Sequence, residues 1–297
     1  MSTMETVRPA PTLRSLAADY LSLTKPTIVG LLVATALAAM VAAAHGRPHP
    51  LAMLAVLIGG SLAAGGAHAI NCWYDRDIDL LMSRTSRRPI PDGRIPAWHG
   101  LAIGIAFNVV AFAVLAAWAN LLAAALAMLA TLIYVFVYTI WLKRSTPQNI
   151  VIGGAAGAIP PLVGWAAVTG GLDLTALSLF LVIFLWTPPH FWALAQMIAR
   201  DYRRAGVPMM PVVASAGSTK RKSVAYAAAT VGASLVPFFT GDAGWIYLAG
   251  ASLLGMGFVA MTLLDLRGRR WTVGLFAYSI AYLAALFTVL AVGALFV

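Results

Sequence analysis

Long apolar runs alternate with short polar segments along almost the whole chain. A transmembrane helix needs about 20 mostly apolar residues. Nine segments meet this requirement, and we predict that each spans the membrane as a helix: 26–44, 52–72, 98–117, 120–141, 149–168, 174–198, 223–240, 243–264 and 272–294. Several are rich in glycine and alanine, which let membrane helices approach closely. The pattern therefore predicts an all-α integral membrane bundle.

Composition supports a membrane protein with a single domain. Of 297 residues, 61% are hydrophobic and 10% are charged, whereas soluble domains carry about 25% charged residues. The single cysteine, Cys72, excludes an intramolecular disulfide and a cysteine-based metal cluster. Residues 1–25 mix acids and bases without an apolar core, so we expect no cleaved signal peptide. We predict one domain over residues 1–297, in which residues 1–25 form a cytoplasmic N-terminal segment.

Basic residues fall almost entirely on one side of the predicted membrane segments. Nineteen of the 20 precede the first segment or follow the second, fourth, sixth and eighth, and only Arg47 lies on the other side. The positive-inside rule then predicts a cytoplasmic N-terminus and an outer C-terminus. The long loops 73–97 and 199–222 are both cytoplasmic, so the chemistry should face the cytoplasm. These loops account for the net charge of +10, and we expect no nucleic-acid partner.

A charged cluster begins where the second predicted helix ends. It contains three carboxylates and three guanidinium groups: Asp75, Asp77, Asp79, Arg84, Arg87 and Arg88. If the helix continues through Asp79, then Asp75 and Asp79 share one face, and we expect both at the boundary with water. Mg²⁺ commonly takes one or two carboxylates with water and substrate phosphates, and arginine offers forked donors to phosphate oxygens. The cluster predicts a diphosphate site, and a solvated loop of mutually neutralising charges is the alternative.

The sixth predicted helix carries a second set of candidate residues. Pro188 and Pro189 are expected to break or kink it, which a membrane tolerates where protein or a cavity satisfies the freed carbonyls. His190 follows, and an ionisable residue inside a spanning segment is a candidate for function; a hydrogen-bonded structural imidazole is the alternative. Asp201 is the only acid in loop 199–222, and it is either a site residue or a plain surface carboxylate.

These blocks, in this order, resemble the UbiA superfamily of membrane prenyltransferases. The first aspartate motif of that superfamily is met by Asn71, Asp75 and Asp79, and the neighbouring Cys72 is typical of the branch that farnesylates heme. The resemblance runs from Leu23 to the ninth predicted helix. Further blocks carry it: Met82, Arg84-Thr85, Arg88-Pro89, Tyr138-Thr139, Leu142-Lys143-Arg144, Gly153-Gly154, Ala158–Pro161 and Pro188–Ala195.

The second aspartate motif of the superfamily departs from the usual pattern. Asp201 is followed by Ala205 at the spacing where many relatives carry another acid, and Arg200 precedes it. The resemblance therefore does not imply a second tightly bound Mg²⁺. Asp201 is instead expected to share the metal of the first motif or to orient a base such as Lys143.

The resemblance implies a fold and a reaction. The fold is a nine-helix bundle around a central cavity that opens to the cytoplasm or laterally to lipid. The reaction joins farnesyl diphosphate to a vinyl group of protoheme IX (heme B) with addition of water, giving heme O and diphosphate. The implied cofactor is Mg²⁺, with Mn²⁺ as a substitute. Heme B is a substrate bound non-covalently, because the chain lacks a Cys-x-x-Cys-His attachment motif.

The resemblance also implies roles for individual residues. The implied metal ligands are Asn71, Asp75, Asp79 and Asp201. The implied diphosphate ligands are Asn71, Arg87, Arg88, Lys143 and Arg144. Lys143 and Arg144 are alternatively topology anchors, and for one of the two that alternative is favoured. The implied catalytic residues are Asp75, Asp79, Asp201 and His190, and His190 would contact heme or position water.

The implied setting and two alternatives complete the hypothesis. We expect the bacterial plasma membrane, with membrane lipid around the protein and a heme-modifying membrane enzyme downstream. One alternative is a UbiA-type transferase that prenylates an aromatic quinone precursor. The other is a transporter of heme or an anionic lipid, but transporters place polar residues near mid-membrane in several helices, whereas this chain concentrates its polar groups on the predicted cytoplasmic side.

Overall fold

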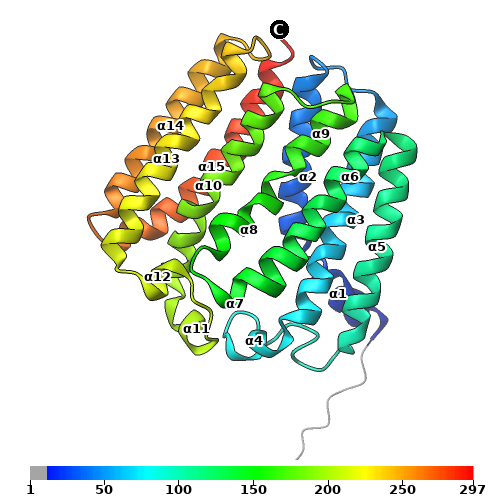
Figure 1. The fold of residues 1–297 in the computed structure, drawn as a ribbon, viewed down its shortest axis with the longest axis vertical. Coiled ribbons are helices and arrows are strands. Elements are labelled where there is room, and N and C mark those ends of the chain that lie inside the picture. Colours follow the sequence, from blue (N-terminus) through cyan, green and yellow to red (C-terminus); the bar gives the residue numbers. More distant parts are fainter. Residues whose placement is uncertain (1–11, 297) are drawn as a thin grey trace, which may run out of the picture.

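The computed structural model describes residues 12–296, and every regular element in this range is helical (Figure 1). Residues 1–11 of the predicted N-terminal segment lie outside the described residues. The elements are α1 (Leu13–Leu23), α2 (Pro26–Ala43), α3 (Pro50–Tyr74), α4 (Arg76–Leu81), α5 (Ala97–Trp118), α6 (Leu121–Leu132), η1 (Ile133–Leu142), α7 (Lys143–Ser145), α8 (Asn149–Ala158), α9 (Pro160–Thr169), α10 (Leu174–Met197), α11 (Ala199–Arg204), α12 (Met210–Val213), α13 (Ala216–Phe239), α14 (Trp245–Asp265) and α15 (Arg269–Gly293).

Eight helical segments among the described residues are long and apolar enough to cross a membrane, and they match eight of the nine predicted segments. They are Pro26–Ala43, Pro50–Tyr74, Ala97–Trp118, Leu121–Ser145, Asn149–Thr169, Leu174–Met197, Trp245–Asp265 and Arg269–Gly293. The remaining predicted segment, 223–240, coincides with α13, a helix of 24 residues. Because α13 begins with a run of lysine and arginine, it is less apolar than the others, and a ninth spanning helix stays a prediction.

Local sequence signals explain where the helices begin. Proline occupies the first position of α2, α3 and α9, where its missing N–H costs nothing because that group has no partner within a helix. The side chains of Asn120, Asp173 and Ser215 cap α6, α10 and α13. Each accepts a hydrogen bond from a backbone N–H three residues further on, which satisfies one of the free donors of the first turn.

The two prolines of α10 do not break the helix, so of the predicted break or kink the break is wrong, and a kink stays a prediction. The helix runs from Leu174 to Met197 straight through Pro188 and Pro189. Each proline removes one backbone N–H donor, but both residues are buried among neighbouring helices. Tertiary packing therefore keeps α10 continuous, an effect that the local sequence does not contain.

Small residues bring neighbouring helices into close contact, as their abundance predicted. A Cβ atom on Gly164 of α9 would lie 2.0 Å from the carbonyl oxygen of Ala36 in α2. A Cβ on Gly104 of α5 would lie 2.7 Å from the carbonyl oxygen of Gly66 in α3. At both crossings backbone packs against backbone, which only glycine permits.

The two ends of the bundle differ in charge. The short helices α1, α4, α7, α11 and α12 gather at one end, and the C-terminus lies at the other (Figure 1). We call the former the basic end, because the described segments there carry the following residues: Arg14, Lys25, Arg76, Arg84, Arg87, Arg88, Arg94, Lys143, Arg144, Arg200, Arg203, Arg204, Lys220, Arg221, Lys222, Arg267, Arg269 and Arg270. The candidate site lies at this end.

Candidate functional site

The junction of α3 and α4 positions the two principal carboxylates. Helix α3 ends at Tyr74. Asp75 is the C-cap residue of α3 and also the N-cap residue of α4. The backbone N–H of Asp79 donates to the carbonyl of Asp75 over 2.9 Å, so the helical turn continues across the junction. The one-turn spacing between Asp75 and Asp79 is thus confirmed. Neither side chain is open to water: the residues are 0% and 2% exposed, because cationic side chains cover them. Their place at the boundary between membrane and water stays a prediction.

Asp75 accepts hydrogen bonds from three side chains. The Asn71 amide nitrogen donates to Asp75 Oδ2 over 2.6 Å, and Lys143 Nζ forms a short ion pair with the same oxygen. Arg144 Nη2 lies 3.5 Å from Asp75 Oδ1. Asn71 is itself fixed by Thr139, whose hydroxyl accepts from Asn71 Nδ2 over 3.2 Å. The Asp75 carboxylate is therefore held by α3 on one side and by η1 and α7 on the other.

Asp79 is held by the segment that follows α4. Arg88 Nη1 donates to Asp79 Oδ2 over 2.7 Å, and Thr85 Oγ1 donates to the Asp79 carbonyl over 2.9 Å. Burial opposes the positive charge of Arg88, but the attraction and hydrogen bond of Asp79, together with other nearby groups, raise the pKa of Arg88. The Arg84-Thr85 and Arg88-Pro89 blocks thus have a local function, because Thr85 and Arg88 wrap the loop around Asp79.

Asp77 faces away from this buried pair, as its position two residues from each partner predicts. Its side chain is 61% exposed, and its two oxygens accept from Arg144 Nη1 and Nη2 at 2.7 Å each. These hydrogen bonds hold the pKa of Asp77 below its usual value. Arg144 also lies over the ring of Tyr74, 5.1 Å from its centroid. Arg144 therefore bridges exposed Asp77 and buried Asp75.

Lys25 is a site residue that the sequence assigned only to membrane topology. It precedes α2 with φ 51°, one of two non-glycine residues with positive φ among the described residues. Such conformations cost energy and cluster at functional sites. Lys25 Nζ donates to Asn71 Oδ1 over 3.0 Å. Loss of water around the ammonium group lowers the pKa of Lys25 to about 8. The available signal was the Thr24-Lys25-Pro26 block at the start of the first spanning helix.

The π-helix η1 shapes the wall beside Asn71. π-Helical segments are rare and often mark functional sites. Tyr134 and Tyr138 of η1 stack with ring centroids 5.6 Å apart, and the Tyr134 hydroxyl lies 3.1 Å from His68 Nδ1. A Cβ on Gly153 of α8 would lie 2.3 Å from the Tyr138 ring. Gly153 therefore allows α8 to accommodate the aromatic side chain of Tyr138.

The remaining candidates do not join the buried aspartates directly. Asp201 Oδ2 accepts from the backbone N–H and hydroxyl of Ser83, at 3.1 Å and 2.6 Å, so it ties α11 to the loop after α4. Arg87 is exposed, and its carbonyl accepts from Arg94. His190 of α10 packs against α15. Its Nδ1 lies 2.7 Å from Ser279 Oγ, and its ring stacks on neighbouring aromatic side chains.

The charges of the site favour a bound anion. We call the polar network the following set of residues: Lys25, Asn71, Asp75, Asp77, Asp79, Arg88, Thr139, Lys143 and Arg144. The Asp79–Arg88 pair adjoins the others through the backbone hydrogen bond from Asp79 to Asp75. Within it, four cationic side chains face three carboxylates. A diphosphate offers the oxygen acceptors that these cations can hold when they leave the carboxylates. Because the cations outnumber the carboxylates, the network favours binding of a diphosphate together with a metal cation.

The donor atoms of the network suit Mg²⁺ held jointly with a substrate. Among residues 12–296 no three His, Cys, Asp or Glu side chains come together to bind a metal alone. Mg²⁺ prefers oxygen ligands and is usually held by one or two carboxylates plus substrate phosphates. Asp75 and Asp79 provide such carboxylates. Asn149 lies beside the network, because its Nδ2 donates to the carbonyl of Lys143 over 3.3 Å; its buried Oδ1 has no hydrogen-bond partner among the described residues.

The fold and this network define a helical membrane protein with a buried network of cations and carboxylates at one end. The chain belongs to the UbiA prenyltransferase family, which it matches over residues 32–280. It is 52% identical over 280 residues to the protoheme IX farnesyltransferase of Roseiflexus sp. (strain RS-1), covering 94% of this chain and 52% of that protein. It is also 52% identical over 292 residues to the protoheme IX farnesyltransferase of Gloeobacter violaceus, covering 97% of this chain and 96% of that protein.

The chain thus spans about half the length of the Roseiflexus relative and nearly all of the Gloeobacter relative. A similar solved structure is that of a UbiA homolog from Archaeoglobus fulgidus bound to DMAPP and Mg²⁺. The TM-score is 0.65 at 20% sequence identity, over 92% of this chain and 99% of that one. This likeness shows that the two chains share a fold.

Proposed function

We propose that this protein transfers the farnesyl group of farnesyl diphosphate to a vinyl group of protoheme IX and adds water, giving heme O and diphosphate. The observation that carries the proposal is the buried pair Asp75 and Asp79, each covered by a cation that a diphosphate can attract. The names of relatives about 50% identical over nearly the whole chain support the choice of farnesyl and heme as donor and acceptor.

The polar network supplies the groups that hold the departing diphosphate. Lys143 and Arg88 cover the two carboxylates, so both can turn to phosphate oxygens without leaving the site. Lys25 adds a third cation from the start of α2. Asp75 and Asp79, with Asn71, would hold Mg²⁺ or Mn²⁺, and the metal would neutralise charge on the diphosphate. Preorganised charges of this kind usually make the largest contribution to such reactions.

The wall next to the network suits an allylic cation. Tyr138 and Tyr134 are stacked on η1, and the adjacent Thr139 accepts a hydrogen bond from Asn71. Aromatic faces attract cations, and an apolar surrounding keeps water from the farnesyl carbon until the vinyl group has reacted. These residues would therefore hold the farnesyl group beside the point where its diphosphate departs.

Asp201 and His190 receive supporting roles in this proposal. Asp201 holds Ser83, which follows Asp79 closely in sequence, so it positions the loop that covers the buried carboxylates; it would have to release Ser83 to bind the metal. His190 is fixed by Ser279 between α10 and α15, which suits contact with the acceptor or its water more than contact with diphosphate. Arg87 is exposed and would reach only the outer face of the diphosphate.

The proposed setting follows from the charge asymmetry. The basic end would face the cytoplasm of a bacterial cell, with the C-terminus outside, and the bundle would lie in the lipid of the plasma membrane. Farnesyl diphosphate would then arrive from the cytoplasmic side. Heme O would leave to a membrane enzyme that modifies heme further.

Mass spectrometry tests this function directly. Purified protein in lipid nanodiscs is incubated with heme B, farnesyl diphosphate and Mg²⁺, and heme O is quantified. Parallel reactions replace heme B by 4-hydroxybenzoate, and an Asp75→Asn variant controls for contaminating enzymes. We expect heme O from the natural chain alone. Prenylated hydroxybenzoate without heme O would identify a quinone-type transferase, and neither product together with heme uptake into sealed vesicles would identify a transporter.

A further inference from the structure

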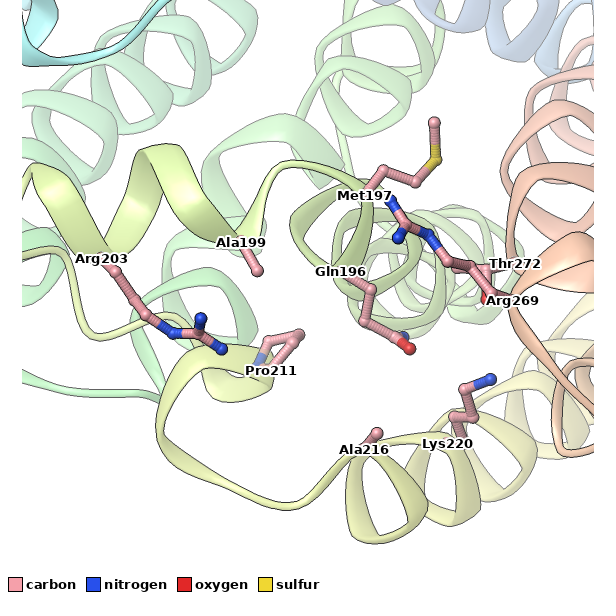
Figure 2. A pocket seen from close by; sticks show the side chains of 9 residues that line it. All are labelled: Gln196, Met197, Ala199, Arg203, Pro211, Ala216, Lys220, Arg269 and Thr272. Carbon is pink, nitrogen blue, oxygen red and sulfur yellow. The ribbon is translucent and has the colours of Figure 1, made fainter.

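A cationic cavity lies at the basic end, and no residue of the polar network lines it. It has a volume of about 290 Å³ and is lined by residues of α10 to α13 and α15: Gln196, Met197, Ala199, Arg203, Pro211, Ala216, Lys220, Arg269 and Thr272 (Figure 2). Arg203, Lys220 and Arg269 enter it from three different elements, and no carboxylate lines it. None of its residues belongs to the polar network. The cavity is therefore a separate place where an anion can bind.

Lys220 is built into the wall of this cavity. The residue is 9% exposed, and its Nζ donates to the Asp265 carbonyl over 2.6 Å and lies 3.0 Å from Asp265 Oδ1. Thr272 Oγ1 donates to the same carboxylate oxygen over 2.5 Å. An ammonium group has three donors, so one remains after these two contacts. A cation that only oriented the helices in the membrane would not need these contacts with Asp265.

The two arginines of the cavity have no acidic partner among residues 12–296. The described residues 199–222 and 265–270 contain nine basic side chains and two acids, Asp201 and Asp265. Asp201 accepts from Ser83, and Asp265 pairs with Lys220 and Thr272. Arg203 and Arg269 form no ion pair within the described part of the chain. Their charge at the cavity is therefore available to a ligand.

The surroundings place this cavity at the depth of lipid headgroups. Trp271 follows the cavity residue Arg269 by two positions, its indole Nε1 is buried without a partner, and Arg270 lies 5.2 Å from its ring centroid. Tryptophan is enriched where a membrane meets water. One turn further along α15, Val273 is 50% exposed on an apolar outer surface. The cavity thus lies where charged groups and the lipid-facing surface of the bundle meet.

We propose that this cavity binds the headgroup of an anionic phospholipid, with the phosphate between Arg203 and Arg269 and with Lys220 as a third donor. Basic pockets between membrane helices on the cytoplasmic side suit such headgroups. The acyl chains would lie along the exposed apolar surface of α15. This site is distinct from the farnesyl diphosphate site, and the proposal does not depend on the enzymatic function.

The test compares two double variants of equal charge. In one, Arg203→Gln and Arg269→Gln remove the cations of the cavity; in the other, Arg204→Gln and Arg267→Gln remove exposed neighbours from the same segments that do not line it. Native mass spectrometry measures phosphatidylglycerol retained from micelles that also contain phosphatidylcholine. We expect the cavity variant to lose retained phosphatidylglycerol by about tenfold or more, while the control changes less than about twofold. Size-exclusion chromatography and thermal melting verify that both variants fold.

Three outcomes would overturn the proposal. Equal losses in the two double variants would mean that the lipid responds to general surface charge. Displacement of phosphatidylglycerol by inorganic phosphate would assign the cavity to a free anion. Displacement by heme B would assign it to the carboxylates of the heme propionates. If the glutamine variants do not fold, Arg203→Lys and Arg269→Lys against Arg204→Lys and Arg267→Lys provide the same comparison without changing the charge, since lysine lacks the bidentate fork.

Discussion

Lys25 and Asn71 are 46 residues apart in sequence, and the Lys25 ammonium donates to the Asn71 amide oxygen over 3.0 Å. Asn71 in turn contacts Asp75, because its amide nitrogen donates to Asp75 Oδ2 over 2.6 Å. The start of α2 is thereby tied to the carboxylate at the end of α3. The strained φ of Lys25 fits this arrangement, since the residue is held in place by its side chain.

Replacing Lys25 by methionine is expected to lower heme O formation by about 10- to 100-fold, because hydrogen bonds to charged groups contribute about 1.5–3 kcal/mol. Arg14→Met, which removes an exposed cation from the same N-terminal region, is the matched control and should retain activity. Initial rates by mass spectrometry measure both. Equal activities of the two variants would remove Lys25 from the site.

Helix positions and the Asp75–Asp79 pair were predictable because both depend on local spacing. Apolar runs of helix length fix the spanning segments, and two residues four apart meet on one helix face. The partners of these aspartates were harder to predict from the sequence. Lys143 contacts Asp75 across 68 residues, and Asp201 reaches Ser83 across 118, so both contacts depend on how the helices pack.

The break expected in α10 and the exposure expected of the two aspartates were missed for the same physical cause. Pro188 and Pro189 weaken α10 locally, but surrounding helices hold it continuous. Asp75 and Asp79 directly follow an apolar run, which predicts contact with water, yet Lys143 and Arg88 cover them. Local sequence determines which conformation and exposure a segment favours. Packing against residues far away in sequence determines whether the segment adopts them.

Removal of divalent metal is expected to abolish turnover without unfolding the protein. A diphosphate must leave with its charge neutralised, so excess EDTA should stop heme O formation, and Mg²⁺ or Mn²⁺ should restore it. The fold should survive, because Lys143 and Arg88 can neutralise Asp75 and Asp79 once the metal has left. Product analysis and a thermal melt of the same sample measure both effects. Full turnover in excess EDTA would contradict a metal-assisted reaction.

Gly153 and Gly157 of α8 offer a matched test of the η1 wall. A Cβ at Gly153 would lie 2.3 Å from the Tyr138 ring, whereas nothing lies within 4 Å of a Cβ at Gly157. Gly153→Ala should therefore destabilise the protein by about 1–3 kcal/mol through overpacking and lower activity by moving Tyr138. Gly157→Ala should be neutral or slightly stabilising. Thermal melts and heme O assays distinguish them, and equal behaviour would show that Tyr138 is not confined by α8.

Reporter fusions test the orientation of the bundle. A cytoplasm-specific reporter fused after Val297 should be inactive, and a reporter that works only outside the cytoplasm should be active there, because the basic residues lie on the side opposite the predicted outer C-terminus. Fusions within loop 199–222 should give the reverse result. A cytoplasmic C-terminus would reverse the predicted orientation and place the site on the outer face.

Asp75, at the junction of α3 and α4, and Asp77 and Asp79 of α4 should respond differently to the same substitution. Asp75→Asn and Asp79→Asn each remove a buried carboxylate, 0% and 2% exposed, and should lower turnover by about 10²–10³ or more while the protein still inserts. Asp77→Asn changes a side chain that is 61% exposed and paired with Arg144 alone, so the loss should be milder. Heme O rates, normalised to folded protein, measure the series. Small and similar losses at all three positions would mean that this segment is a charged surface loop, and the assignment of Asp75 and Asp79 to the metal and diphosphate would be wrong.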